Sequence, residues 1–166
     1  MAYVIRPFCS NDAPALAELT LAAIRTVGAT SYSPEQVDAW AARHPGPERF
    51  LAQIADGAWI AVASDKADTA IAYALLDVKP ERDGHLDMLY CHPGHTRMGL
   101  ADRLLLASEY HARDVGLTRL YTEASELARP TFERAGYSVK HRRDFEITHN
   151  GRAVPIHNYS MEKHLF

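Results

Sequence analysis

The order strand, tight loop, long helix across residues 86–116 is the feature that most constrains how this chain can fold. The apolar run at 85–91 predicts a strand, and the loop after it predicts a break before a helix over residues 99–115. The positions that recur broadly on one face of that helix are Leu100, Leu104, Ala107 and Val115, with Gly116 where a helix C-terminus favours glycine. A strand that turns into a long helix indicates a sheet with a helix packed on it.

The remaining segments extend this unit into a mixed α/β (α+β) domain with a largely antiparallel sheet. Further strands are expected over residues 3–7, 58–64, 69–78, 119–123, 137–148 and 153–162. Further helices are expected after Asn11 or Asp12, from Ser33-Pro34, over 48–55 and over 126–134. Asn150-Gly151 predicts a tight hairpin between the last two strands. The 166 residues hold no repeat or linker, which favours one domain over residues 1–166.

Composition and charge exclude several classes of protein. The formal net charge of -3 gives little support to nucleic-acid binding or to binding an anionic membrane. The sequence has two cysteines, Cys9 and Cys91, which argues against a disulfide framework and fits a reducing compartment. The first residues lack the pattern of a signal peptide, and no apolar stretch approaches the ~20 residues that cross a bilayer. A cytoplasmic protein is therefore expected.

The loop at residues 96–102 runs directly into the N-terminus of the long helix. The first amides of a helix have no partner within it, and they converge with the positive end of the helix dipole. This makes the loop a candidate site for a phosphate or diphosphate. Gly99 would let a ligand approach the backbone, Ala101 keeps the next position small, and Arg97 can add a charge-assisted bond. The alternative is an ordinary strand-to-helix turn, since neither G-x-G-x-x-G nor a Walker loop is present.

Several motifs together resemble the GNAT superfamily of acyltransferases. They are L-Y-x-H-P at residues 89–93, G-x-A at 99–101, Ser125-x-x-Ala128 with Phe132, and Gly136-Tyr137. The resemblance spans about residues 58–163 and is strongest over 86–137. The segment from Tyr32 to Trp40 resembles a bacterial branch of small members of that family.

Two positions depart from the family's pattern. Thr96 stands where the family usually has Gln or Arg, although Arg97 is adjacent. Phe132 stands where many members have a tyrosine that protonates the leaving thiolate, and a phenyl ring cannot do this.

The resemblance implies a GNAT-like fold, with a twisted, mixed and mostly antiparallel sheet of six to seven strands, four to five flanking helices and a splayed central strand pair. It implies acetyl-CoA as acyl donor, no metal, and direct attack by a small-molecule or peptide amine. The pantetheine arm would pair with the backbone of Leu89 and Cys91, the pyrophosphate would bind the amides of residues 97–102, and Ser125 would contact the cofactor near its sulfur. The cofactor-binding residues expected from the resemblance are Leu89, Tyr90, Cys91, Arg97, Met98, Gly99, Leu100, Ala101, Asp102, Ser125, Ala128 and Phe132.

An alkylammonium is not nucleophilic, so a base must take its proton. The candidates are Asp87, Glu123, His157 and Tyr159, with Glu123 or Asp87 favoured and Tyr159 open as an acid. Strand alternation predicts that Asp87 shares a face with Leu89 and Cys91. Each carboxylate has the alternative role of a salt-bridged surface group.

The acceptor pocket is expected to use Tyr32, Gln36 and Trp40, which are spaced four apart. The alternative is that Trp40 is a core residue and Gln36 is solvated.

Three rival readings stay open. Histidines near Cys91, or those along the last hairpin, could hold a metal, but zinc needs three or four converging ligands. Cys91 could be a nucleophile, although a small buried packing role fits it better. A non-catalytic acyl-CoA sensor would explain Phe132 and the lack of one obvious base. Dimerisation is common among similar proteins, and the sequence does not identify an interface.

Overall fold

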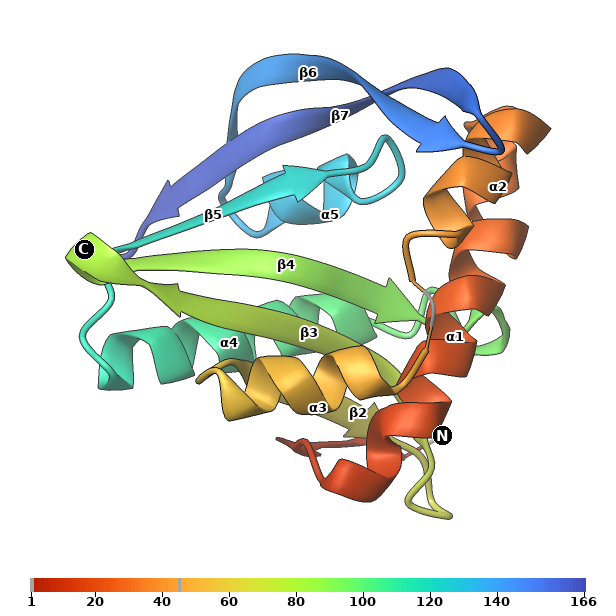
Figure 1. The fold of residues 1–166 in the computed structure, drawn as a ribbon. Coiled ribbons are helices and arrows are strands. Elements are labelled where there is room, and N and C mark those ends of the chain that lie inside the picture. The colour runs from red at the N-terminus through yellow and green to blue at the C-terminus, as the bar shows by residue number, and fades with distance from the viewer. Residues whose placement is uncertain (1, 45) are drawn as a thin grey trace.

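The computed structural model describes residues 2–44 and 46–166, so Met1 and Pro45 of the predicted domain lie outside the described residues. One seven-stranded sheet runs through the molecule in the order β1-β2-β3-β4-β5-β7-β6 (Figure 1). All neighbouring strands are antiparallel except β4 and β5. The strands are β1 (Val4–Pro7), β2 (Trp59–Ser64), β3 (Ala70–Lys79), β4 (Asp83–Cys91), β5 (Arg119–Ala124), β6 (Ser138–His149) and β7 (Arg152–His164).

Helices cover both faces of this sheet. The described residues form α1 (Ala13–Thr26), α2 (Pro34–Ala41), α3 (Glu48–Ala55), α4 (Leu100–Asp114) and α5 (Arg129–Arg134). Leu105 of α4 and Phe132 of α5 belong to one core cluster, whereas Leu16 of α1 and Phe50 of α3 belong to another. Val37 of α2 packs with the β6–β7 hairpin (Figure 1). The arrangement confirms the predicted mixed α/β fold with a mostly antiparallel sheet.

The local sequence signals account for the element boundaries. Ser33 caps α2 by accepting the Gln36 amide, and the Gln36 side chain accepts the Ser33 amide in return. Asn150 and Gly151 both have positive φ, at 51° and 72°, as a tight hairpin turn requires. The predicted helix at 48–55 matches α3, and the predicted strands match within two residues at each end.

Helix α5 begins three residues later than predicted. Residues 126–128 form a turn, and α5 starts at Arg129. Pro130 explains the difference because it has no N–H, so a helix from Glu126 would lose the bond from residue 130 to the Glu126 carbonyl. In α5 the proline lies in the first turn, where no such bond is needed. The helix is therefore only six residues long, and the dipole at its start is smaller than the sequence suggested.

The pairing of β4 with β5 stops early. The two strands pair in parallel only over three positions, the last of which joins His85 to Tyr121. Just beyond, the buried Thr122 hydroxyl donates to the Leu86 carbonyl at 2.8 Å. The Thr122 side chain thus donates to a backbone carbonyl that would otherwise accept a hydrogen bond from the next position of β5. The centre of the sheet is open from this point.

A bulge bends β4 away from β5 at the same level. Leu75 of β3 pairs with Met88 and Leu76 pairs with Leu86, so Asp87 is an extra residue on β4. The extra residue reverses the alternation of side chains along β4. Leu86 packs in the cluster with α4 and α5, whereas Met88, two residues later, packs on the other face in the cluster with α1 and α3. The predicted splayed strand pair is therefore present.

Gly84 permits the close approach of β4 and β5 before they separate. A Cβ atom at this position would lie 2.5 Å from Leu120 and 2.9 Å from both Leu117 and Leu76. All three leucines are at most 2% exposed and have little room to move. We expect Gly84→Ala to lower the free energy of unfolding by about 1–3 kcal/mol, because extra bulk in a close-packed core forces strain.

Denaturant unfolding of Gly84→Ala and the wild type measures this effect. Gly94→Ala is the control, since Gly94 is exposed and has ordinary backbone angles; its change should stay near 0.5 kcal/mol or less. Equal stability of Gly84→Ala and the wild type would mean that the leucines can withdraw.

Candidate active site

The loop before α4 presents backbone amides without partners inside the helix. Gly99 precedes the helix in the left-handed region, at φ 72° and ψ 13°, and Arg97 also has a positive φ of 62°. The Arg103 amide donates to the Gly99 carbonyl at 3.2 Å, so helical bonding begins there. The amides of residues 100–102 come before it, and no side chain within residues 2–44 and 46–166 caps this helix.

A cavity of about 460 Å³ adjoins this loop, and we call it the loop cavity. It extends from the start of α4 to the end of β4 and the turn after β5. All the predicted cofactor-binding residues line it except Phe132: Leu89, Tyr90, Cys91, Arg97, Met98, Gly99, Leu100, Ala101, Asp102, Ser125 and Ala128.

The backbone of β4 forms an open edge beside the loop cavity. The His92 amide donates to the Ile71 carbonyl of β3 at 2.8 Å. Alternate residues of an antiparallel strand direct their backbone groups to the same side, so Tyr90 also bonds toward β3. The backbone N–H and C=O groups of Leu89 and Cys91 therefore point away from β3, into the gap between β4 and β5. An extended ligand could pair with this edge as an added strand.

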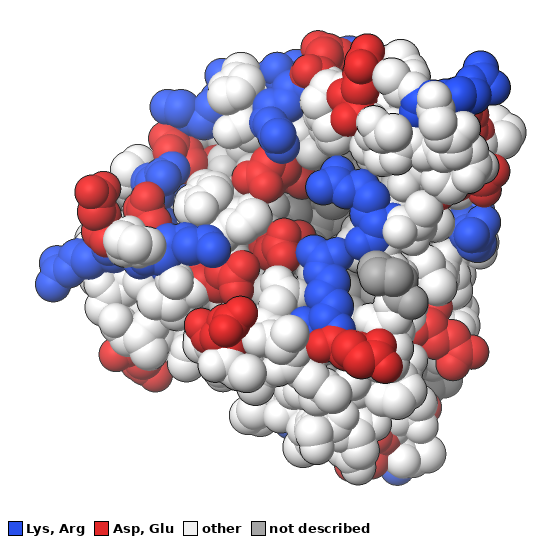
Figure 2. Space-filling view, in the orientation of Figure 1, with Lys and Arg blue, Asp and Glu red and all other residues white. Residues whose placement is uncertain are grey.

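A second cavity, of about 620 Å³, lies mainly on the side of the sheet that α1 and α3 cover. We call it the charged cavity. Figure 2 shows acidic and basic side chains meeting around a hollow in the middle of this face. The charged residues that line the cavity are Arg43, Arg49, Asp87, Glu123, Arg143 and Glu146.

The two cavities meet where β4 and β5 separate. Both are lined by Leu89 and Tyr90 of β4 and by Ser125 and Ala128 after β5. Trp40 also lines both. A ligand in the loop cavity and one in the charged cavity can therefore touch through the opening in the sheet.

Asp87 lies on the opposite face of β4 from Leu89 and Cys91, so the face predicted for it is wrong. The bulge at Asp87 breaks the alternation on which that prediction depended. Its carboxylate accepts from Gln53 of α3 at 3.0 Å and pairs with Arg49 at 3.5 Å. It therefore faces the charged cavity.

Glu123 also lines the charged cavity, from the end of β5. Its carboxylate is 2.8 Å from Nε2 of His85, and the His85 ring stacks on Tyr121 at 4.7 Å. Burial lowers the pKa of His85, but the hydrogen bond and the charge of Glu123, with Asp87 and Asp77 nearby, more than compensate and raise it above its ordinary value. The contact therefore places an imidazole and a carboxylate together next to the cavity.

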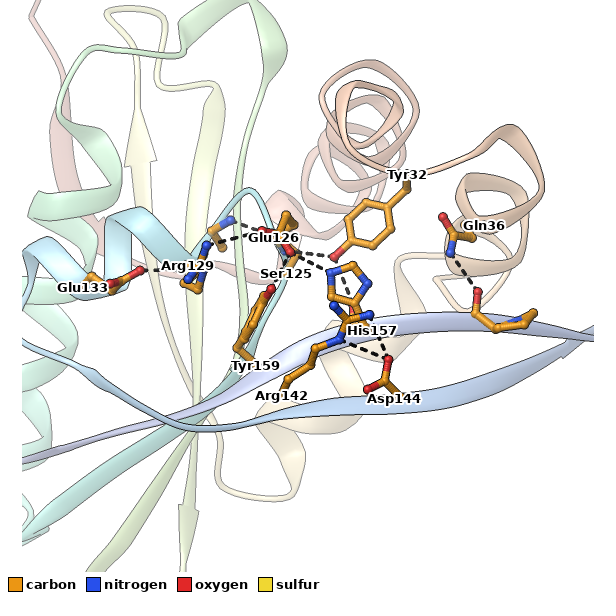
Figure 3. A network of polar contacts seen from close by, with 12 residues as sticks. Tyr32, Gln36, Ser125, Glu126, Arg129, Glu133, Arg142, Asp144, His157 and Tyr159 are labelled. Carbon is orange, nitrogen blue, oxygen red and sulfur yellow. Dashed lines mark hydrogen bonds and ion pairs between the residues drawn. The ribbon is translucent and has the colours of Figure 1, made fainter.

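Tyr159 lies in a polar network around Glu126, as Figure 3 shows. Its hydroxyl donates to Glu126 Oε2 at 2.8 Å, and His157 Nε2 is 2.6 Å from the same oxygen. The bonds from His157 and Tyr159 lower the pKa of Glu126, and the same contact raises the pKa of Tyr159. Among the described residues, Tyr159 is not part of either cavity's lining, whereas His157 lines the charged cavity.

The three predicted acceptor residues separate in the structure. Tyr32 precedes α2, and its hydroxyl accepts the Glu126 amide at 2.9 Å and donates to the His157 carbonyl at 3.0 Å. Trp40 packs edge-on against Tyr32 at 5.5 Å, and both line the charged cavity. Gln36 lines neither cavity in the described part of the chain, because its side chain caps α2 and donates to the Pro155 carbonyl at 2.8 Å.

Residues 24–137 match the family model of the acetyltransferase (GNAT) family. This match covers more than half of the chain. The chain belongs to the GNAT family. As a member of that family it is an enzyme, an acetyl-CoA-dependent acyltransferase.

Similar GNAT proteins match most of its length, and two solved structures share its fold. The crystal structure of a GCN5-related N-acetyltransferase (aminotransferase, class-II) from Rhodopseudomonas palustris is 30% identical, with a TM-score of 0.83 over 99% of this chain and 96% of that one. The PaiA N-acetyltransferase from Thermoplasma acidophilum, in complex with coenzyme A, is 20% identical, with a TM-score of 0.79 over 99% of each chain. The uncharacterized N-acetyltransferase YafP from Escherichia coli (strain K12) is 28% identical over 148 residues, 84% of both chains.

In this GNAT protein the surroundings of Phe132 and Cys91 are those of packed side chains. Phe132 is 2% exposed and meets Tyr137 edge-on at 5.1 Å, although it reaches the lining of the charged cavity. Burial raises the pKa of the Cys91 thiol to about 11, and the thiol lies 3.4 Å from the His95 carbonyl. A thiol with so high a pKa is a poor nucleophile near neutral pH.

Sequence reasoning missed the basic side chains of the charged cavity. Arg43 and His44 follow α2, Arg49 lies in α3 and Arg143 lies in β6. No motif links these positions, because elements far apart in the chain bring them together. Arg43 and Arg49 lie near element ends, and Arg143 belongs to the basic run at residues 140–143, which the sequence offers either as a local basic site or as a solvated strand edge.

The described residues contain neither a candidate metal site nor a helix that could span a membrane. No three or more His, Cys, Asp or Glu side chains in that part of the chain are grouped so that they could hold a metal ion. No helix there is long and apolar enough to span a membrane.

Gly99→Glu is expected to abolish acetyl-CoA binding, because it places bulk and negative charge beside the amides of residues 100–102. A calorimetric titration with acetyl-CoA measures the loss. Gly99→Asn is the matched control, since asparagine tolerates the left-handed backbone and adds no charge. Wild-type affinity in a folded Gly99→Glu variant would mean that the cofactor binds elsewhere.

Proposed function

We propose that this protein is an N-acetyltransferase that moves an acetyl group from acetyl-CoA to the primary amine of a small molecule or peptide by direct attack. The observation that carries the proposal is the junction of the two cavities at the gap between β4 and β5. It provides a path for the donor on one side of the sheet and for the acceptor on the other, with the reacting atoms in the opening between them.

The donor is proposed to occupy the loop cavity. The amides of residues 97–102 and the positive end of α4 suit a diphosphate, and Arg97 can add a charge-assisted bond. The pantetheine arm would pair with the backbone of Leu89 and Cys91, which places the thioester near Ser125 at the junction. The similar fold of PaiA, whose structure contains coenzyme A, supports this assignment.

In the proposed reaction the amine nitrogen attacks the thioester carbonyl, the C–N bond forms and the C–S bond breaks with its electron pair going to sulfur. An amide of the open β4 edge would stabilise the oxyanion that develops on the carbonyl oxygen. Phe132 cannot protonate the thiolate, but a thiol with an ordinary pKa of ~8.5 leaves readily near neutral pH. No dedicated acid is required.

Glu123 is proposed as the base that takes the proton of the amine. It lies near the end of β5, in the wall next to the junction, and its hydrogen bond to His85 connects it to an imidazole that can accept or donate a proton. Asp87 is the second candidate, but its carboxylate is held by Gln53 and Arg49. Both roles are open to direct test.

The proposal is tested by measuring release of free CoA from acetyl-CoA against a library of amines. At least one amine should cause release in amounts equal to the acetylated product detected by mass spectrometry. Acetyl-CoA binding with no release for any amine would instead indicate a binding or sensor protein.

Glu123→Gln is expected to lower kcat/KM for the amine by about 100-fold, the usual contribution of a general base, without changing KM for acetyl-CoA. Asp87→Asn should lower kcat/KM for the amine by a smaller factor. Glu133→Gln is the control, because this carboxylate is half exposed and lies outside both cavities. Equal losses for the two variants, or none, would mean that water or the substrate takes the proton.

A further inference from the structure

We infer that the natural acceptor carries a negatively charged oxygen group, a carboxylate or phosphonate, in addition to its primary amine. The inference rests on the proposed function and narrows its acceptor to an amino-acid-like small molecule. It follows from two arginines of the charged cavity, Arg43 and Arg143, which no carboxylate pairs among the described residues, while two carboxylates lie on its floor.

The floor of the charged cavity is acidic. Asp87 and Glu123 both lie on strands of the central sheet, beside the opening through which the thioester would be reached. Asp87 is contacted by Gln53 at 3.0 Å and Arg49 at 3.5 Å, and Glu123 by His85 at 2.8 Å, yet the two carboxylate side chains remain 24% and 30% exposed. This end of the cavity therefore suits an ammonium group, the form in which an amine arrives at neutral pH.

The rim of the charged cavity is basic. Arg43 and Arg49 come from the segment after α2 and from α3, and Arg143 comes from β6 on the opposite side. Among the described residues no carboxylate forms an ion pair with Arg43 or Arg143; Arg143 donates instead to the Asn158 side chain at 3.2 Å. Arg49 is already paired with Asp87. Glu146 is the carboxylate at the rim, so among the described residues two arginines, Arg43 and Arg143, face a single negative charge. Guanidinium groups bind carboxylates and phosphonates through paired hydrogen bonds.

His44 does not alter this balance near neutral pH. Burial, and then the charge of Arg49, hold its pKa at about 4, so the ring is neutral. Its Nδ1 is 3.2 Å from the Arg49 guanidinium and accepts a hydrogen bond from it. The contact orients Arg49 along the wall of the cavity and leaves the arginines as the source of positive charge.

The volume of the cavity favours a small acceptor. At about 620 Å³ it falls within the range of ~300–1,000 Å³ typical of small-molecule sites. An acceptor with an ammonium group and an anionic group could pair with the carboxylates and with the arginines at once, whereas a simple alkylamine would leave Arg43 and Arg143 without a partner. Desolvated and unpaired arginines would weaken its binding.

Matched acceptor pairs test the inference with the wild-type protein. L-amino acids and straight-chain amino acids of increasing length are compared with their carboxamides, and aminoalkyl phosphonates with the corresponding alkylamines, by release of CoA. The anionic member of a pair should have a kcat/KM at least about 10-fold higher, as expected for a charge-assisted hydrogen bond. The two series also distinguish a carboxylate from a phosphonate acceptor. Dipeptides with a free carboxylate reveal whether a longer acceptor is preferred.

Arg43→Gln and Arg143→Gln identify the group that recognises the anion. Each should raise KM for the anionic acceptor by about 10-fold, with little change in kcat, in KM for acetyl-CoA, or in activity toward the carboxamide. Arg25→Gln is the control, because Arg25 is exposed, pairs with Asp38 at 3.3 Å and lines neither cavity.

The outcomes separate this inference from the proposed function. Equal kcat/KM for anionic and neutral members of every pair would overturn the inference and leave the transferase intact. Loss of activity in the arginine variants toward both members alike would also overturn it, since the arginines would then support the fold. Absence of CoA release with every acceptor would refute the proposed function, and the inference with it.

Discussion

The early end of the pairing between β4 and β5 is the feature on which the rest of the site depends. Gly84 lets the strands come close at one end, and the Thr122 hydroxyl takes the Leu86 carbonyl where they part. The bulge at Asp87 then bends β4 away. Because a sheet normally satisfies all its backbone groups, an opening in its centre leaves an edge that a ligand can pair with. In this GNAT protein the opening also joins two cavities that the sheet would otherwise separate.

The same bulge decides the electrostatics of the site. By reversing the alternation of β4 it turns Asp87 toward α3, where it shares a cavity with Glu123. The two carboxylates lie on strands of the sheet, and Arg43 and Arg143 lie on elements packed around them, where no carboxylate among the described residues pairs with either arginine. This preorganisation is what allows a cavity to bind both ends of a zwitterion without rearranging.

Much of this arrangement is visible in local sequence patterns. The glycine loop, the Ser33 cap and the Asn150-Gly151 turn each act over a few residues, and the structure has all three. The predictions that failed depended on continuing a regular pattern through an irregular point. Alternation across β4 placed Asp87 on the wrong face because of the bulge. The helix predicted from Glu126 ignored the missing N–H of Pro130. Grouping Tyr32 with Gln36 by their four-residue spacing required a helix that already includes Tyr32, but α2 begins at Pro34.

The sequence by itself determined the order of strands and helices, the loop that presents free amides before α4, and the family to which these motifs point. These depend on backbone geometry and side-chain periodicity, which act between near neighbours in the chain. Only the tertiary structure decided where the sheet opens, which face Asp87 occupies, and that Arg43, Arg49 and Arg143 surround one cavity with Glu123. Those positions are as much as 100 residues apart, and nothing local couples them, because the packing of α2, α3 and β6 around the sheet is what brings their charges together.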